Sequence, residues 1–569
     1  MIRRLLSSRR VAWPVATTVA VALWLVYSRP PSRIANNNVA PSGGHVVRGA
    51  LHVHSQRSDG GGTLDDIAEE ANAAGLDFVV VTDHGDGTVG TRATYYDDLL
   101  LVEGAEISTR GGHYIAVGHG PTSYPLGGDA KGVVEDVRRH GGLGIVAHPN
   151  SSGEGLAWQD PALPVDGVEW LNADSQWRMS GVLPFAKAVT WYWLKPTESL
   201  GMLLTRPTET MHQWRHRRVF GVGGVDAHAR LVVLGDGQYG GGGLTLSVPS
   251  YHTMFGLFGV RVALEKPFSG LADQDVNFLL DGFKKARSYI VVDAYGEPGK
   301  FDFFGERIDS NELVEMGDEV GEGVVSKFRA RVDGATDVAI RLLRDGEVVK
   351  EVHSSELSYS GLNYELATQG DGRRISYWVE IFRSGVPSMP WIISNPIHIG
   401  VEDELAVEVS SGDLDDSVQP LSLSSWFIER SADAAASGSS RNGGFVMDYE
   451  LGEGSATYVA VAHDVSTGII ESTIRLLVAM DKPARVSLQL RDNDGIDRRW
   501  RTSFYVDTEL RRINASISEF LPVTDKLPKA VPVDQIDDLL LVVDRVNARA
   551  NSSGSIGIGT LVLDDGRAN

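Results

Sequence analysis

Cysteine is absent from the 569 residues of this chain, which excludes disulfide bonds, thiolate metal sites and a lipoprotein anchor. Positive charge is also scarce, because 53 Lys and Arg residues face 75 Asp and Glu residues and the formal net charge is −22. A chain this acidic lacks the extended positive surface that binds polymeric nucleic acid. We therefore do not expect long nucleic acid as a partner. The charge balance favours small or neutral substrates over a polymerase-type nuclease.

The N-terminus carries a segment typical of a membrane address. Four arginines within residues 1–10 precede the uncharged run 11–27, which is at the short end of the range for a spanning helix, about 17–25 residues. No good small-x-small cleavage site precedes Arg29. We predict a signal anchor or transmembrane segment over 1–29 and a linker over 30–44. The basic start predicts a membrane-anchored protein whose folded domains are periplasmic or extracytoplasmic.

Side chains of the kind that bind metals follow apolar runs throughout the first half of the chain. Four groups of them close short apolar runs that are typical of buried strands, such as 78–81 before Asp83 and His84. A barrel of parallel strands gathers its strand ends around one pocket, where imidazoles and carboxylates can share metal ions. The candidate ligands are His52, His54, Asp59, His84, Glu106, His113, His148, Asp226 and His228.

Each motif taken alone has a structural explanation. An Asp-His pair is common at turns and helix caps, and a His before proline can be a packed core residue. The Asp226-Ala227-His228 motif can be a simple ion pair. Nine candidates that all follow the same strand–loop pattern are much harder to explain as turn, cap or core residues. The pattern as a whole therefore predicts one shared site.

The motifs resemble those of the PHP superfamily, named for its polymerase and histidinol-phosphatase members. The resemblance covers roughly residues 45–300, and within the family the chain is similar to the carbaryl-hydrolase-like branch of secreted or membrane-associated metallohydrolases. The matching segments, in the order of the family, are His52-Val53-His54, Asp83-His84, 104–109 with Glu106, 112–118 with His113, Ala147-His148-Pro149 and Asp226-Ala227-His228.

The resemblance implies a distorted (β/α)7 barrel with a metal cluster at the C-terminal ends of its strands. The first ion would take His52, His54, Glu106 and Asp226. Glu106 would bridge to a second ion held by His113 and His148, with His119 as a weaker alternative to His113. A third ion would bind Asp59, His84 and His228. All nine family positions are filled, so the resemblance implies an active enzyme.

The ligand types indicate the chemistry. Imidazole and carboxylate without thiolate suit two or three ions of Zn, Mn or Fe, which activate water and stabilise charge on an ester. Glu106 would bridge two ions, and Asp226 could pass a proton to the leaving group. Arg230, just after the cluster, could pair with a phosphate oxygen, although a surface arginine is the alternative interpretation.

Residues 177–214 are rich in aromatic and apolar side chains and allow three interpretations. They can form helices that pack on the outside of the barrel, or an apolar wall over the metals that favours an aromatic or lipid-like substrate. A contact with a membrane surface is the third. Elsewhere the barrel segment alternates strand and helix, with a predicted helix over 64–74 capped by Thr63.

The second half of the chain is β-rich. A chain of this length suggests three domains, and the strand pattern past residue 300 predicts an immunoglobulin-like β-sandwich over 301–400. The segment 420–569 resembles the galactose-binding-like jelly roll of carbohydrate-binding modules, which implies carbohydrate as a possible partner. We therefore predict a multidomain α/β plus β protein: a barrel over 45–300 followed by two sandwiches.

Two classes of function compete. The first is an exported metal-dependent hydrolase that acts on a small ester, with a phosphoester preferred and a carboxyl or carbamate ester as the close alternative. The second is a surface carbohydrate-binding protein whose barrel is vestigial. The complete ligand set argues against the second class, because a site that no longer functions is expected to lose ligand residues.

Overall fold

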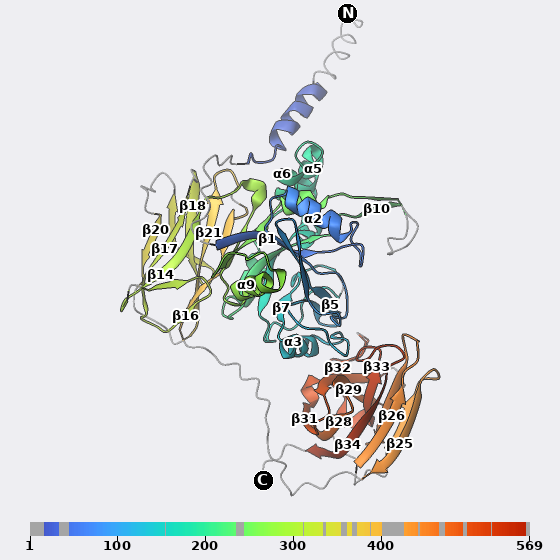
Figure 1. Cartoon of the computed structure of the whole chain (residues 1–569). Coiled ribbons are helices and arrows are strands. Elements are labelled where there is room, and N and C mark those ends of the chain that lie inside the picture. The colour runs from blue at the N-terminus through green and yellow to red at the C-terminus, as the bar shows by residue number, and fades with distance from the viewer. Residues whose placement is uncertain are drawn as a thin grey trace, which may run out of the picture.

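The computed structural model describes a mixed α/β chain in which strands outnumber helices (Figure 1). The described residues are 16–33, 45–153, 155–234, 244–310, 312–333, 337–353, 361–366, 373–386, 388–400, 426–441, 444–465, 473–492, 498–524 and 526–564. Residues 1–15 of the predicted anchor and 34–44 of the predicted linker lie outside these ranges. The predicted α/β plus β class is confirmed at this coarse level.

A closed sheet lies at the centre of residues 45–300. Its parallel strands are, in spatial order, β4 (Leu99–Glu103), β2 (Phe78–Val81), β1 (His45–Val53), β9 (Phe220–Ala227), β8 (Gly167–Asn172) and β7 (Leu143–Val146). The antiparallel strands β6 (Gly112–Val117) and β5 (Ala105–Thr109) follow, and β3 (Arg92–Tyr96) pairs with β4. A parallel bridge between His84 and Glu106 joins β5 back to the end of β2. The exact (β/α)7 arrangement stays a prediction.

Helices cover the barrel because their apolar faces match its outer surface. In α2 (Leu64–Ala73), Thr63 and Asp66 form a capping box at the start, and Ile67 and Ala71 are buried. This confirms the predicted cap. The helix α3 (Ala130–Arg139) begins three residues before the predicted start, because Asp129 caps it by accepting from the N–H of Gly132. Two further helices of this part are α8 (Tyr251–Phe255) and α9 (Ala272–Lys284).

The aromatic-rich segment folds into four short helices, α4 (Ala173–Met179), α5 (Val182–Trp191), α6 (Pro196–Gly201) and α7 (Thr208–Trp214). Its second half packs into the core, where Leu204 and Trp214 are buried. Its first half does not, since Val182 and Trp193 are 88% and 79% exposed. The segment therefore combines packed helices with an exposed apolar surface on α5. A β-ribbon of β10 (Leu231–Leu234) and β11 (Leu244–Leu246) projects beside it (Figure 1).

The predicted membrane anchor is wrong for the part of the chain that the structure describes. None of the described helices is both long and apolar enough to cross a bilayer. Near the end of the helical residues 16–27, Trp24 Nε1 donates to Thr190 Oγ1 of α5 at 3.1 Å, whereas the apolar side chains of Leu23 and Val26 are exposed. The membrane localisation was inferred from this anchor, so the same finding contradicts it.

The barrel sheet continues into the next unit without a break. The first half of β1 pairs with β12 (Gly259–Leu264), which pairs with β13 (Ser288–Val291). The sheet runs on through β22 (Ile392–Ser394), β21 (Ile375–Arg383), β18 (Val338–Arg344) and β19 (Glu347–His353). The short strands β23 (Ile397–Ile399) and β16 (Glu319–Val320) extend it beside β21. Strands on both sides of residue 300 therefore belong to one sheet.

A second sheet faces this extension and completes a sandwich. Its order is β15 (Leu313–Glu315), β14 (Phe301–Arg307), β17 (Val325–Val332) and β20 (Leu362–Glu365). Phe328 of β17 lies 4.7 Å from the ring of Tyr377 on β21, measured between centroids, and both are buried. The immunoglobulin-like identity of this sandwich stays a prediction.

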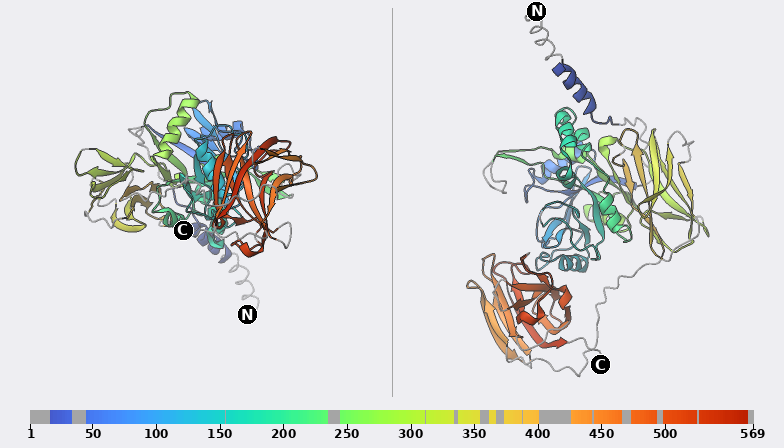
Figure 2. Two further views of the ribbon diagram at one scale, coloured as in Figure 1. Left: turned by 90° about the horizontal axis from the view of Figure 1, so that it is seen from below. Right: turned by 180° about the vertical axis from the view of Figure 1, so that it is seen from behind.

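Residues 426–564 form two further sheets around their own core. The first has the order β24 (Trp426–Arg430), β27 (Tyr458–Asp464), β33 (Ile536–Asp544), β29 (Ala484–Asp492), β30 (Arg499–Val506) and β32 (Leu521–Pro522). The second has the order β25 (Ala435–Arg441), β26 (Gly444–Glu450), β34 (Ser553–Asp564), β28 (Thr473–Met480) and β31 (Arg511–Ser516). Figures 1 and 2 show this orange-to-red unit beside α3 of the barrel, which it contacts through β29 and β30.

Candidate metal centre

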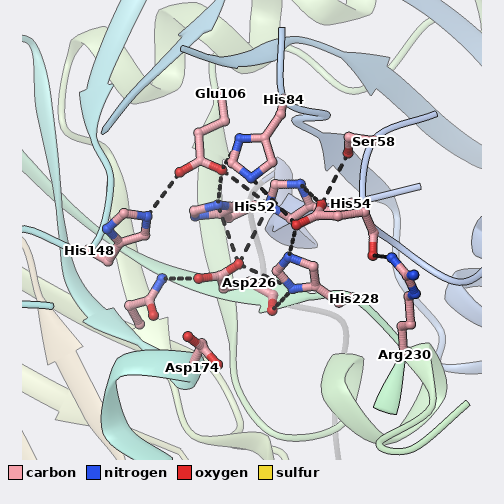
Figure 3. Close-up of polar contacts among 12 residues, drawn as sticks. His52, His54, Ser58, His84, Glu106, His148, Asp174, Asp226, His228 and Arg230 are labelled. Carbon is pink, nitrogen blue, oxygen red and sulfur yellow. Dashed lines mark hydrogen bonds and ion pairs between the residues drawn. The ribbon is translucent and has the colours of Figure 1, made fainter. Parts of the chain in front are cut away.

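The structure brings all nine predicted ligands together at one end of the barrel. Each comes from a strand end, a neighbouring turn or the β5–β6 pair, where parallel strands direct their last residues toward a common pocket. Figure 3 shows His52, His54, His84, His148 and His228 around Glu106 and Asp226. The sequence pattern therefore predicted which side chains meet.

Glu106 on β5 lies at the centre, with its two oxygens facing different histidines. Its Oε2 is 3.1 Å from His52 Nε2 and 3.2 Å from His54 Nε2. Its Oε1 is 2.7 Å from His113 Nδ1 and 2.9 Å from His148 Nε2. This division of partners is the geometry of a bridging carboxylate.

Asp226 at the end of β9 faces a second set of imidazoles. Its Oδ1 is 3.5 Å from Nε2 of both His52 and His54 and 3.6 Å from His228 Nδ1. Asp59 completes this side, with Oδ2 lying 3.2 Å from His228 Nε2. Imidazole nitrogens and carboxylate oxygens therefore alternate across the whole cluster.

Asp59 also approaches the nitrogens of two other histidines. Its Oδ1 is 3.3 Å from His54 Nδ1, and its Oδ2 is 3.6 Å from His84 Nε2. The side chains of Asp59, His84 and His228 are 30–41% exposed, whereas His52, His54 and Glu106 are almost fully buried. The cluster is therefore open to solvent on the Asp59 side.

The donor set fits divalent cations. In four overlapping groups of three residues, one ligand atom from each lies within 4.8 Å of the others. The groups are His52–His54–Asp226, His52–Glu106–His148, His54–Asp59–His228 and His54–His84–Glu106. Both ring nitrogens of His54 are buried, and neither makes a hydrogen bond to any described residue. Such buried nitrogens, which face carboxylates, could share an ion with them.

The backbone is strained where it presents the ligands. His52, His148 and Asp226 have φ of 69°, 28° and 47°, in the left-handed region that non-glycine residues rarely adopt. At His52 the register of β1 shifts against both β2 and β9, which marks a bulge. Conformations of this kind persist where surrounding structure enforces them, and they concentrate at functional sites.

Electrostatics within the cluster favour cations. Burial opposes charge on His52, but Asp226, Glu169 and Glu106 outweigh it and raise the pKa of His52 well above its usual value. The same competition, with Asp226 and Glu106 as partners, raises the pKa of His54 to about 9. Despite burial, the imidazoles hold the pKa of Glu106 and of Asp226 well below the usual range. The carboxylates thus need positive charge, which protons or metal ions can supply.

The two remaining predictions for single residues differ in outcome. The side chain of Arg230 lies at the edge of the cluster, with Nη1 3.4 Å from the carbonyl oxygen of Asp59 (Figure 3). His119 does not join the cluster, because its buried Nε2 donates to the carbonyl of Gly87 at 2.8 Å. It therefore has a structural partner in place of a ligand role.

A pocket of about 290 Å³ opens beside the cluster. Asp59, Asp226 and His228 form its metal-binding side, and Arg178 and Arg230 bring guanidinium groups to the same space. The side chain of Arg178 is paired with Asp174. A pocket of this size accommodates a small ester, since ligand sites for drug-sized molecules run from about 300 to 1,000 Å³.

Sequence reasoning missed a set of polar residues behind the ligands. Glu169, within a predicted strand, accepts from His52 Nδ1, and Asn172 Nδ2 donates to Asp226 at 3.2 Å. Asp83 accepts from the backbone and hydroxyl of Ser55. The available signal was an acidic residue inside an apolar strand, Gly167–Asn172, where a buried carboxylate requires partners.

Comparisons with known proteins give only distant likenesses. No family model matches the chain, and no curated protein matches it. A two-domain protein from Bacteroides vulgatus, described as containing a predicted PHP-like metal-dependent phosphoesterase, is 13% identical. The likeness covers 65% of this chain and 99% of that one, with a TM-score of 0.30.

The last unit has likenesses of its own. A family 11 carbohydrate-binding module from Clostridium thermocellum, solved with a mixed-linked tetrasaccharide, is 16% identical over 26% of this chain and 91% of that one, with a TM-score of 0.21. An exo-β-agarase is 13% identical, and the likeness covers 25% of this chain and 24% of that one, with a TM-score of 0.19. These values are too low to assign a family or a substrate, so the metal centre rests on its own geometry.

Proposed function

We propose that this protein is a metal-dependent hydrolase of the PHP type that acts on small phosphoesters. One observation carries the proposal: Glu106 divides its two oxygens between separate histidine sets in a buried cluster that also contains Asp226. This is the arrangement expected of a site that holds two or three ions of Zn, Mn or Fe. The narrower resemblance to the carbaryl-hydrolase-like branch stays a prediction from the motifs.

Ions bound here would supply Lewis-acid activation of water and stabilise charge on the ester. The chain's own residues would do the rest. Asp226 lines the pocket beside the cluster, so its carboxylate is our candidate to accept a proton from the attacking water. That proton can then pass to the leaving group.

The pocket supports the choice of a phosphoester. Arg178 and Arg230 line it on the side away from the buried histidines, and a guanidinium group pairs well with phosphate oxygens. Its volume of about 290 Å³ suits a small molecule better than a polymer. The formal net charge of −22 supports the same choice, because it disfavours long nucleic acid.

The experiment measures metal content by elemental analysis and turnover on the same sample of the full chain. Substrates are p-nitrophenyl phosphate mono- and diesters, carboxyl esters and carbamates. Glu106→Gln removes the bridging charge with little change in shape, so we expect loss of metal and of at least 100-fold in kcat/KM, roughly 2.7 kcal/mol. His353→Ala is the matched control, because His353 is 60% exposed on β19 and outside the cluster.

Other outcomes discriminate among the alternatives. Turnover of carboxyl esters or carbamates but not phosphoesters would assign the same centre to the other bond. Wild-type protein that binds no Zn, Mn or Fe, together with glycan binding by the chain, would favour a carbohydrate-binding protein with a vestigial barrel. Equal metal content in the wild type and Glu106→Gln would contradict the bridging role.

A further inference from the structure

Glu169 on β8 is a buried carboxylate outside the predicted ligand set. Its side chain is 0% exposed, and both of its oxygens accept hydrogen bonds. Its Oε1 accepts from His52 Nδ1 at 2.6 Å, and its Oε2 accepts from the backbone N–H of His148 at 2.8 Å and from Asn172 Nδ2 at 2.9 Å. Asn172 also donates to Asp226. One carboxylate is therefore connected to three members of the cluster, which come from different strands.

We propose that Glu169 is a positioning residue of the metal centre that sets the tautomer and ring orientation of His52. The inference rests on the proposed function. A carboxylate can only accept, so Nδ1 of His52 carries a proton. The other nitrogen, Nε2, lies 3.1 Å from Glu106 Oε2, and with the proton held on Nδ1 its lone pair would be available to a bound cation. Partners of this kind change metal affinity or activity by about 10–100-fold when removed.

A glycine on the neighbouring strand makes room for this carboxylate. A Cβ atom on Gly224 of β9 would lie 1.8 Å from Oε1 of Glu169 and 2.4 Å from its Cδ. Gly224 is not among the residues with positive φ, so its backbone does not require glycine. Glycine inside a strand weakens the strand, and close approach of another group is a reason to retain it. Here the approaching group is Glu169.

A purely structural role fits these contacts less well. Taking a carboxylate out of water costs several kcal/mol, and an apolar side chain of similar volume is often at least as stable. Glu169 directs its hydrogen bonds to His52, to His148 and, through Asn172, to Asp226. Packing alone does not explain this selection of partners.

The test measures Zn²⁺ affinity by competition with a chromogenic chelator, on the full chain, beside thermal unfolding. For Glu169→Gln we expect 10–100-fold weaker Zn²⁺ binding. Gly224→Ala displaces the carboxylate without removing it, so we expect weaker binding and a lower Tm. Glu380→Gln is the matched control: Glu380 is also buried, and its carboxylate accepts from Arg206 and Trp378 rather than from a candidate ligand, so its loss should leave Zn²⁺ affinity unchanged.

The double variant Glu169→Ala/Gly224→Ala separates positioning from space filling. The added Cβ atom enters the space that the carboxylate leaves, so we expect a higher Tm than for Gly224→Ala alone but Zn²⁺ binding that stays weak. Recovery of wild-type affinity by the double variant would overturn the inference, as would Glu169→Gln binding within threefold of the wild type. Neither of these two results would contradict the proposed hydrolase function. A wild-type chain that binds no Zn²⁺, Mn²⁺ or Fe²⁺ would overturn both.

Discussion

Arg485 is the buried link between the barrel and the last unit, and its removal is expected to separate the two in unfolding. Its side chain is 1% exposed on β29, and Asp136 of α3 is 0% exposed. Nε donates to Asp136 Oδ2 at 2.8 Å, and Nη2 donates to Asp136 Oδ1 at 3.2 Å and to Glu135 at 2.7 Å. Nη1 also donates to Ser503 at 3.0 Å. The guanidinium group is thus satisfied almost entirely across the interface.

The magnitude follows from what Arg485→Met leaves behind. Methionine keeps the apolar part of the side chain but leaves the buried Asp136 without its closest cation. The cation that remains nearby is Arg139, at 3.6 Å from Asp136. Breaking a buried pair in this way costs about 3–5 kcal/mol. The control is Lys131→Met, which removes an interface ion pair with Glu519 whose members are 45% and 37% exposed. Exposed pairs contribute about 0–1 kcal/mol, so the control should change little.

Differential scanning calorimetry of the full chain measures the effect, and limited proteolysis reports release of the last unit. In Arg485→Met we expect a lower-temperature transition for that unit and faster cleavage. Adding Asp136→Asn removes the stranded charge, so the double variant should be more stable than Arg485→Met alone. A change below 1 kcal/mol in Arg485→Met, or one equal to that of Lys131→Met, would refute the reasoning.

Two further predictions concern pH. Burial lowers the pKa of His398 to about 3. Between about pH 6.5 and pH 3 the unfolded chain therefore binds a proton that the folded chain excludes. The stability that the neutral His398 contributes is fully present above pH 6.5, and it falls by up to about 1.4 kcal/mol for each pH unit below that. Urea unfolding from pH 7 to 4 should show a smaller pH dependence in His398→Gln than in the wild type, and equal slopes would contradict this. The pKa of His54, raised to about 9, means that a proton competes with metal below that pH. Zn²⁺ affinity should therefore rise from pH 6 to 9 with proton release, and an affinity that is flat over that range would exclude the competition.

The meeting of the candidate ligands at one end of the barrel was predictable because it depends on local patterns that survive folding. Short apolar runs followed by His, Asp or Glu mark strand ends, and parallel strands bring those ends to one edge. The pairing of Glu106 with two histidine sets follows from that topology. The predicted membrane span is wrong because none of the described helices is both long and apolar enough to cross a bilayer.

The roles of Gly224 and Arg485 had no comparable signal, and for Glu169 the signal was only an acidic residue inside an apolar strand. Each depends on a partner far away in the chain, such as Arg485 with Asp136, and the periodicity of a strand does not specify which element will cover it. The sheet that continues from β13 to β22 is likewise a pairing across about a hundred residues. Nothing in the local pattern of either strand specifies that register.

By itself, then, the sequence determined which side chains can bind metal and that they lie at strand ends, because ligand chemistry and strand periodicity are local properties. The tertiary structure alone decided which carboxylate accepts from His52 Nδ1 and which surface of the last unit contacts the barrel. These depend on distances between residues far apart in the chain, which are set when the sheets close and pack.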